Sequence, residues 1–221
     1  MTLSSMSFVP SEMSTAEVEA SEALYGGLAQ DVRHLVDVAI RTNVGADRVA
    51  AARELVRQAE QVLAEDASTG PAGIQFNTEG RSWNWGNAVV GVRNAIAPPV
   101  ILRWADDGSV RSDVDLGVAY EGPPGCVHGG VSALLLDHLM GETASAAHTR
   151  LIVTGTLTLR YLKPLPLGRV RMQAQVTNED DRKVTVTAHL GAADGEPAVE
   201  ATGLFIVPRW ARDGSVSGSL D

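Results

Sequence analysis

The segment from Gly122 to Gly141 holds the residues best suited to chemistry. Two prolines and a glycine exclude regular structure before His128, and Gly129 and Gly130 then open a helix. The first turn of a helix has backbone N–H groups without partners and carries a partial positive charge. Directed at a carbonyl oxygen, such donors stabilise the negative charge that develops when the carbonyl carbon is attacked. The helix start is therefore a candidate oxyanion-binding site.

Asp137 lies on the same segment, in a helix made mostly of Val, Ala, Leu and Met residues. A carboxylate is costly to bury there without a partner, so it has a structural hydrogen bond, an exposed position or a catalytic role. At 1.5 Å per residue, Asp137 lies roughly 10 Å along the helix from Gly130. One substrate carbonyl cannot contact both within one chain. If both act together, we expect a symmetric dimer in which the carboxylate comes from the second subunit.

Two other interpretations of this segment are disfavoured. Cys126 and His128 could form a nucleophilic pair, but they lie in a Pro/Gly turn with no Asn or Asp placed to orient them. A metal site built from His128, Asp137, His138 and His148 is geometrically poor, because His138 and His148 would point about 80° apart and lie about 15 Å from each other on a helix. Cys126 is the sole cysteine, which excludes an all-thiolate metal site within one chain. We expect no metal and no cofactor.

The downstream part of the chain predicts the scaffold for these residues. Apolar and polar residues alternate with a period of two, as in half-buried strands, and short Pro/Gly/Asp-rich breaks join the strands as antiparallel hairpins. A helix is expected from Gly130 to about His148. The strands before and after it are expected at residues 100–104, 114–120, 154–161, 170–176, 184–190 and 199–207. In strand 154–161, Thr154, Thr156, Thr158 and Arg160 should share one face. This order predicts an α+β fold in which an antiparallel sheet curls around one long central helix.

The first 70 residues differ in pattern and charge. They carry 11 acidic and 5 basic side chains, a net charge of −6, so most of the net charge of −9 of the whole chain lies in this part. Apolar residues recur at three- and four-residue steps, which predicts two helices joined at Asn43–Gly45, the second capped by Asp47. The Gly26-Gly27 pair should delay or kink the first helix. We expect residues 1–70 to form a helical extension, 71–211 the main domain and 212–221 a flexible tail, with the extension packed on the main domain, at an oligomer interface or against a partner.

Composition narrows the function classes. A net charge of −9 with 5% aromatic residues disfavours nucleic-acid binding. No apolar run approaches the 18 residues of a membrane-spanning helix, and the first 15 residues lack a secretory pattern. A soluble, cytoplasmic protein is expected.

Taken together, the motifs resemble the hotdog-fold thioesterases, and most closely their phenylacetyl-CoA and mammalian THEM-type branch. The resemblance rests on His128-Gly129-Gly130, on the acid nine residues after the histidine, and on the segment Val153–Pro166 with its threonines and its Tyr–Leu–Lys–Pro ending. It covers about residues 75 to 208 and leaves the N-terminal helices outside.

The resemblance implies an acyl-CoA thioesterase of lipid metabolism that acts as a homodimer or a dimer of dimers. Gly130, with Gly129, would polarise the thioester carbonyl, and Asp137 would be the nucleophile or the general base. Thr154 would position the water or the carboxylate, and His128 would support the turn. Arg160 and Lys163 are candidate contacts to the CoA phosphates.

One position departs from the family pattern. Relatives often carry Asn six residues before the histidine, where this chain has Gly122. The resemblance also leaves two alternatives open: a non-catalytic acyl-CoA sensor or scaffold, and a hotdog dehydratase or hydratase.

Overall fold

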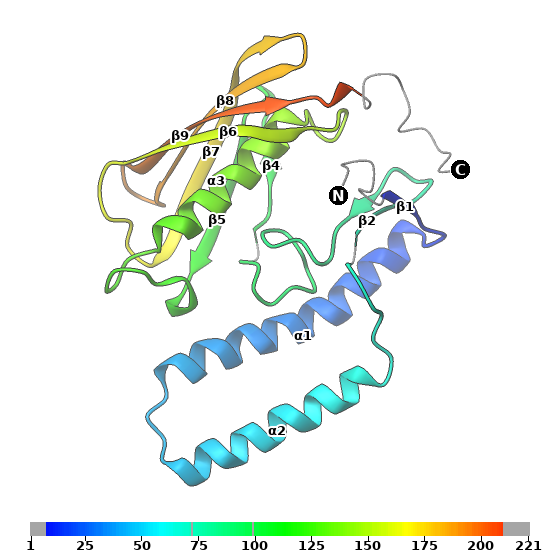
Figure 1. Cartoon of the computed structure of the whole chain (residues 1–221), viewed down its shortest axis with the longest axis vertical. Helices are drawn as coiled ribbons and strands as arrows, with labels where there is room; N and C mark the ends of the chain where they lie inside the picture. Colours follow the sequence, from blue (N-terminus) through cyan, green and yellow to red (C-terminus); the bar gives the residue numbers. More distant parts are fainter. Residues whose placement is uncertain (1–7, 72, 99, 210–221) are drawn as a thin grey trace. The chain divides into compact units, whose positions relative to one another are not determined.

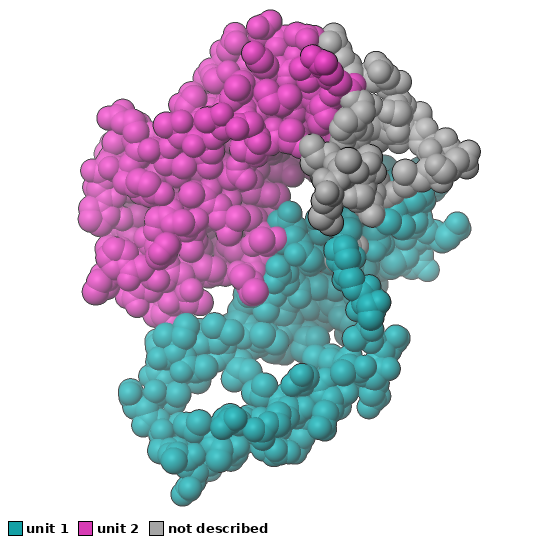
Figure 2. Space-filling model, viewed as in Figure 1, with its two compact units in different colours: residues 1–87, 91–95 teal, residues 88–90, 96–221 magenta. Residues whose placement is uncertain are grey.

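The computed structural model describes residues 8–71, 73–98 and 100–209, so the tail expected at 212–221 lies outside the described residues. The chain forms two compact units, residues 1–87 with 91–95 and residues 88–90 with 96–221 (Figure 2). The first unit therefore extends past the boundary expected near residue 70. None of the described helices is both long and apolar enough to cross a membrane.

Hydrogen bonds and ring contacts hold residues beyond 70 in the first unit. The Arg93 guanidinium lies between the rings of Tyr25 and Trp85, 3.7 and 3.6 Å from their centroids, and donates to Ser21 Oγ at 2.6 Å. Asn77 Nδ2 donates to the Met13 carbonyl at 3.1 Å. A breaker cluster such as residues 68–71 marks the end of a helix, but here it does not mark the end of the packed unit.

The first unit contains two helices and a small sheet. Its elements are β1 (Phe8–Pro10), α1 (Thr15–Arg41), α2 (Ala46–Ala64), β2 (Ile74–Phe76) and β3 (Ser82–Trp83). The strands lie in the order β1-β2-β3, with β1 parallel to β2 and β2 antiparallel to β3.

The helix boundaries of this unit correct two expectations. α1 begins with a capping box between Ser14 and Glu17 and runs unbroken through Gly26 and Gly27. The cap of α2 is Gly45, without a side-chain hydrogen bond, and Asp47 lies inside the first turn. There its negative charge is still favourable, because it lies near the positive end of the helix dipole.

The second unit has the predicted α+β architecture. Its elements are β4 (Arg103–Trp104), β5 (Val110–Leu116), the short 3-10 helix η2 (Val118–Tyr120), α3 (Gly129–Ala144), β6 (Val153–Tyr161), β7 (Gly168–Asp180), β8 (Lys183–Ala192) and β9 (Pro197–Ile206). The sheet order is β4-β5-β7-β8-β9-β6, and every neighbouring pair is antiparallel. α3 lies against one face of this sheet and contacts β5 to β9 (Figure 1).

Three boundaries in this unit differ from expectation. The first strand is shorter than predicted, the second is Val110–Leu116 rather than 114–120, and residues 118–120 are a helical turn rather than strand. α3 ends at Ala144 instead of continuing to His148. Ala146, Ala147 and His148 have φ values of 50°, 55° and 65°, a left-handed conformation that stops a right-handed helix.

The core confirms the period-two pattern of the sequence. Leu135, Leu136, Leu139 and Met140 of α3 are fully buried against the sheet. The inward strand residues alternate with outward ones, as predicted; they include Val170, Met172, Ala174, Val184, Val186, Ala188, Leu190, Val199, Ala201 and Phe205. Burial of these side chains fixes which end and which face of α3 remain accessible.

Candidate active site

The turn that begins α3 is held by His128. This residue is the N-cap, and its Nδ1 accepts a hydrogen bond from the Gly130 N–H at 3.0 Å. The N–H groups of Val131 and Ser132 donate to the His128 carbonyl at 2.9 and 3.2 Å. Among the described residues, the Gly129 N–H has no acceptor, so it is the free donor of the first turn.

Tyr161 fixes the same turn from the end of β6. Its hydroxyl donates to the Gly129 carbonyl at 2.9 Å. A Cβ on Gly129 would lie 3.3 Å from the Tyr161 ring, so the glycine allows this close approach. The sequence pattern predicts Tyr161 at the end of this strand, after the threonine-rich alternation, but does not predict its hydrogen bond to the turn.

A pocket of about 490 Å³ lies at this end of α3. Such a volume is within the range of small-molecule sites. Gly129, Ser132, Tyr161 and Lys163 line it together with Cys126 and a set of apolar residues: Pro123, Val127, Leu162, Pro164, Leu165 and Val199. The structure thus brings Gly129 and Lys163 to one pocket.

Arg160, the other predicted phosphate contact, lies elsewhere. Its guanidinium makes an ion pair with Glu200 of β9 at 3.3 Å, and it does not line the pocket. Lys163 makes no ion pair among the described residues, which leaves its ammonium group available to an anionic ligand.

Asp137 has a specific partner on β6. The Thr154 hydroxyl donates to Asp137 Oδ1 at 3.0 Å, and Asp137 is a half-buried residue. Asp137 therefore satisfies one of its acceptor sites inside the protein and retains others for a ligand or a water molecule.

A β-bulge explains how Thr154 reaches the helix. The register between β6 and β9 shifts between Thr154 and Thr156, so Thr154 lies opposite the inward-facing Phe205. Strict alternation had placed Thr154 on the same face as Thr156, Thr158 and Arg160, and this expectation was wrong. Gly155 supplies the extra residue, and a Cβ there would lie 3.2 Å from Ile206 Cγ1 and from the Leu204 carbonyl oxygen.

The two groups of site residues lie apart within the chain. Asp137 does not line the pocket at Gly129, and the separation of eight residue positions corresponds to about 12 Å along α3. One end of α3 thus offers a free backbone donor beside a pocket, and a carboxylate–hydroxyl pair lies two turns further along.

Gly122 is required by close packing. A Cβ at this position would lie 2.7 Å from the His128 Cα. No amide side chain fits there unless the capping histidine moves. The departure from the family pattern is therefore tied to the local backbone path, and the Gly129 N–H is the donor that remains.

Two histidines and a glutamate meet at the far end of α3. His148 Nε2 lies 2.5 Å from Glu142 Oε2, and His138 Nε2 lies 3.8 Å from Glu142 Oε1. Burial lowers the pKa of His138, whereas the hydrogen bond to the Glu142 carboxylate raises the pKa of His148. Across residues 8–71, 73–98 and 100–209, no group of three His, Cys, Asp or Glu side chains could hold a metal ion.

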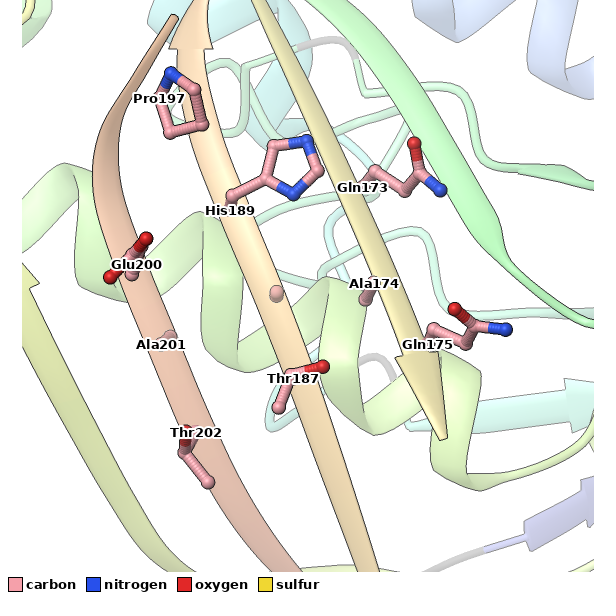
Figure 3. A pocket seen from close by; sticks show the side chains of 10 residues that line it. Gln173, Ala174, Gln175, Thr187, His189, Pro197, Glu200, Ala201 and Thr202 are labelled. Carbon is pink, nitrogen blue, oxygen red and sulfur yellow. The ribbon is translucent and has the colours of Figure 1, made fainter. Parts of the chain in front are cut away.

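A second hollow lies on the outer face of the sheet (Figure 3). It has a volume of about 390 Å³ over β7, β8 and β9, and its polar lining includes Gln173, His189 and Glu200. These side chains alternate with core residues that face α3, so the sheet separates this hollow from Gly129 and Asp137. No residue of the candidate site lines it.

Comparisons with known proteins agree with this architecture. The family model described as thioesterase superfamily matches residues 124–199. The acyl-coenzyme A thioesterase THEM4 of Xenopus laevis is 37% identical over 88 residues, 39% of this chain and 39% of that protein. The same enzyme of Mus musculus is 34% identical over 92 residues, 41% of this chain and 39% of that protein. The matched region therefore spans about two fifths of these curated relatives.

One solved structure is similar over most of the chain. The crystal structure of a thioesterase superfamily protein has a TM-score of 0.73 and 35% identity, and it covers 82% of this chain and 94% of that chain. This share exceeds the residues of the second unit alone, so the similarity extends into the first unit.

Proposed function

The chain belongs to the thioesterase superfamily, and we propose that it hydrolyses acyl-CoA thioesters to a free carboxylic acid and CoA. The observation that carries this proposal is the hydrogen bond from Thr154 of β6 to Asp137 of α3, the helix whose N-terminus presents a free N–H to a pocket. The activity named for the curated relatives supports the choice of thioester.

Each part of the reaction has a residue suited to it. The Gly129 N–H donates to the thioester oxygen and stabilises the negative charge that forms there. The Asp137 carboxylate either attacks the carbonyl carbon or removes a proton from the attacking water, and Thr154 orients it. With water as the nucleophile, the C–S bond then breaks and the free acid is released. With Asp137 as the nucleophile, breaking the C–S bond leaves an acyl-aspartyl anhydride, which a water molecule hydrolyses to the free acid. In both routes the CoA thiolate leaves and takes up the proton that the water releases. CoA thiolate is a good leaving group, so the step needs no Lewis acid.

The distance between the two groups supports a shared site in a homodimer. About 12 Å separates Gly129 from Asp137 along one helix, which is too far for one carbonyl. β6 carries Thr154 and is an edge strand that, among the strands of the described residues, pairs only with β9, so its outer edge can pair with a second copy. A two-fold axis beside β6 would make the two α3 helices antiparallel and bring Asp137 of one subunit towards Gly129 of the other.

A thioester panel tests the activity. Purified protein is mixed with short-chain, long-chain and aryl acyl-CoA substrates, and the released thiol is measured with a chromogenic disulfide. We expect turnover of at least one class. If acyl-CoA binds in calorimetry while no member of the panel releases thiol above background, the chain is a binding protein and the proposal is wrong.

Replacing Lys163 by glutamine should raise KM for acyl-CoA by roughly 10-fold and leave kcat within about twofold, because the lysine contacts the CoA phosphates and not the reacting carbonyl. Arg160→Gln is the matched control, since Arg160 already pairs with Glu200 and lies outside the pocket. The ammonium has no such role if both variants change KM equally or if higher salt leaves the KM of the native protein unchanged.

Thr154→Val should lower kcat by about 10-fold, because a hydrogen bond to a charged group contributes about 1.5 kcal/mol. Thr154→Ser keeps the hydroxyl and should retain most of the activity. Steady-state kinetics of both variants separate the hydrogen bond to Asp137 from the packing of β6. A loss of activity in Thr154→Ser with none in Thr154→Val would show that the methyl group matters and the hydroxyl does not.

A further inference from the structure

α1 and α2 each carry an exposed apolar seam. Residues at alternating steps of three and four form the α1 stripe (Leu24, Leu28, Asp31, Leu35, Val38) and the α2 stripe (Val49, Ala52, Val56, Ala59, Leu63), and all ten are exposed. This spacing is the a/d pattern with which helices pack in coiled coils and bundles. Leu24, Val38 and Leu63 expose 70%, 55% and 50% of their area.

The hairpin leaves both seams without a partner inside its own unit. Every residue of α2 is exposed, and α1 buries only Val18 and Ala29. Open space separates the two helices in the space-filling view (Figure 2). Most of the stability of a helix in a protein comes from packing of its apolar face, so a 19-residue helix with no buried side chain lacks the surface that would stabilise it.

The charges favour a second copy of the hairpin as the occupant. Asp31 lies in the middle of the α1 stripe, and Arg53 lies beside the middle of the α2 stripe; neither makes an ion pair among the described residues. α1 has five acidic and two basic residues, whereas α2 has three of each. When the stripes pack antiparallel with their centres aligned, Asp31 of one copy comes to the level of Val56 of the other, and Arg53 lies about 4.5 Å along the helix from that level, within reach of its long side chain.

A lipid surface is a poorer fit for the same stripes. The two helices together carry eight acidic and five basic residues, whereas helices that lie on anionic membranes have an excess of Lys and Arg. Both stripes also span the same number of residues, so two helices can pack against each other along the whole length of the stripes.

We propose that the α1–α2 hairpin is a self-association element. The hairpins of two copies form a four-helix bundle in which the α1 stripe of each copy packs on the α2 stripe of the other, with Asp31 paired to Arg53 across the interface. This association is independent of the hotdog interface that the proposed active site needs, and it would join two hotdog dimers into a larger assembly.

The mass of the particle that the chain forms in solution tests this interface. Val56→Glu places a charge in the α2 stripe, and we expect it to halve the number of subunits per particle in light scattering at micromolar concentration. Ala50→Glu is the matched control, because it adds the same charge at an exposed position on the opposite face of α2 and should leave the mass unchanged. Acyl-CoA turnover per subunit should stay within twofold in both variants, so failure of the bundle and failure of the proposed activity are separate results.

A charge exchange tests the pairing without disturbing the apolar seam. Asp31→Arg and Arg53→Asp should each weaken association by about 10-fold or more, and the double variant should restore it. A double variant as dissociated as the single ones overturns the proposed register. Equal particle masses for the native chain and Val56→Glu overturn the proposed bundle. If the native chain then binds phosphatidylcholine vesicles and Val56→Glu does not, the stripes bind lipid instead.

Discussion

Replacing Asp137 by asparagine is expected to lower kcat for acyl-CoA hydrolysis by about 10²- to 10⁴-fold, the range that a positioned acid–base group contributes. The amide has the size of the carboxylate, and its oxygen can still accept the hydrogen bond from Thr154. The helix and the bulge of β6 should therefore persist, while the group that attacks or activates water is lost. Single-turnover and steady-state thiol release measure the effect.

The matched control for this variant is an acid five residues further along the same helix. Glu142→Gln changes the same kind of side chain on the same helix, but Glu142 contacts His138 and His148 and not the pocket. We expect its kcat to remain within about threefold of the native value. If Asp137→Asn keeps full activity with an unchanged thermal transition, Asp137 is a structural residue and the base lies elsewhere.

The scaffold was the most predictable part of this molecule. Inward residues such as Val170, Val186 and Phe205 follow strict alternation, because a strand buried on one face must repeat every two residues. α3 was predicted from its glycine-rich start and its apolar run, and its burial in the sheet follows from that composition. These features depend on local pattern alone.

The site details depend on contacts that are not local. Gly155 signals a possible irregularity in β6, but only pairing with Phe205 and Leu204 shows that the bulge turns Thr154 towards Asp137. Likewise, His128 was expected to support the turn, while its bond to the Gly130 N–H, which leaves the Gly129 N–H free, needed the actual geometry. The first compact unit extends past residue 70 because Arg93 packs between the rings of Trp85 and Tyr25, and Tyr25 is distant from Arg93 in sequence.

Gly129→Pro should lower kcat by about 10²- to 10³-fold, the usual cost of losing one oxyanion donor. Proline removes the N–H while keeping a helical φ, and position 129 is the first residue of α3, where proline is well tolerated. His128 already has φ −62° and ψ 133°, the extended conformation that a residue before proline prefers. The helix should therefore still begin at the same residue.

Gly129→Ala controls for the added side chain. A Cβ at this position lies 3.3 Å from the Tyr161 ring, so both variants share this contact, but alanine keeps the donor. The ratio of kcat between alanine and proline isolates the N–H from the packing against Tyr161. A kcat ratio near one would show that the Gly129 N–H is not the oxyanion donor.

Combining the two inactive variants distinguishes a shared site from a single-chain site. When Asp137→Asn and Gly129→Pro chains are co-expressed with different tags, a random mixture of dimers contains one half heterodimers. In a shared site, each heterodimer has one centre with both an intact Gly129 and an intact Asp137, so activity per subunit should recover to about a quarter of native. In a single-chain site, every centre lacks one group, and the mixture stays at the low activity of its parents. Purified heterodimer sharpens the test, because its expected activity is about half of native and neither parent approaches that value.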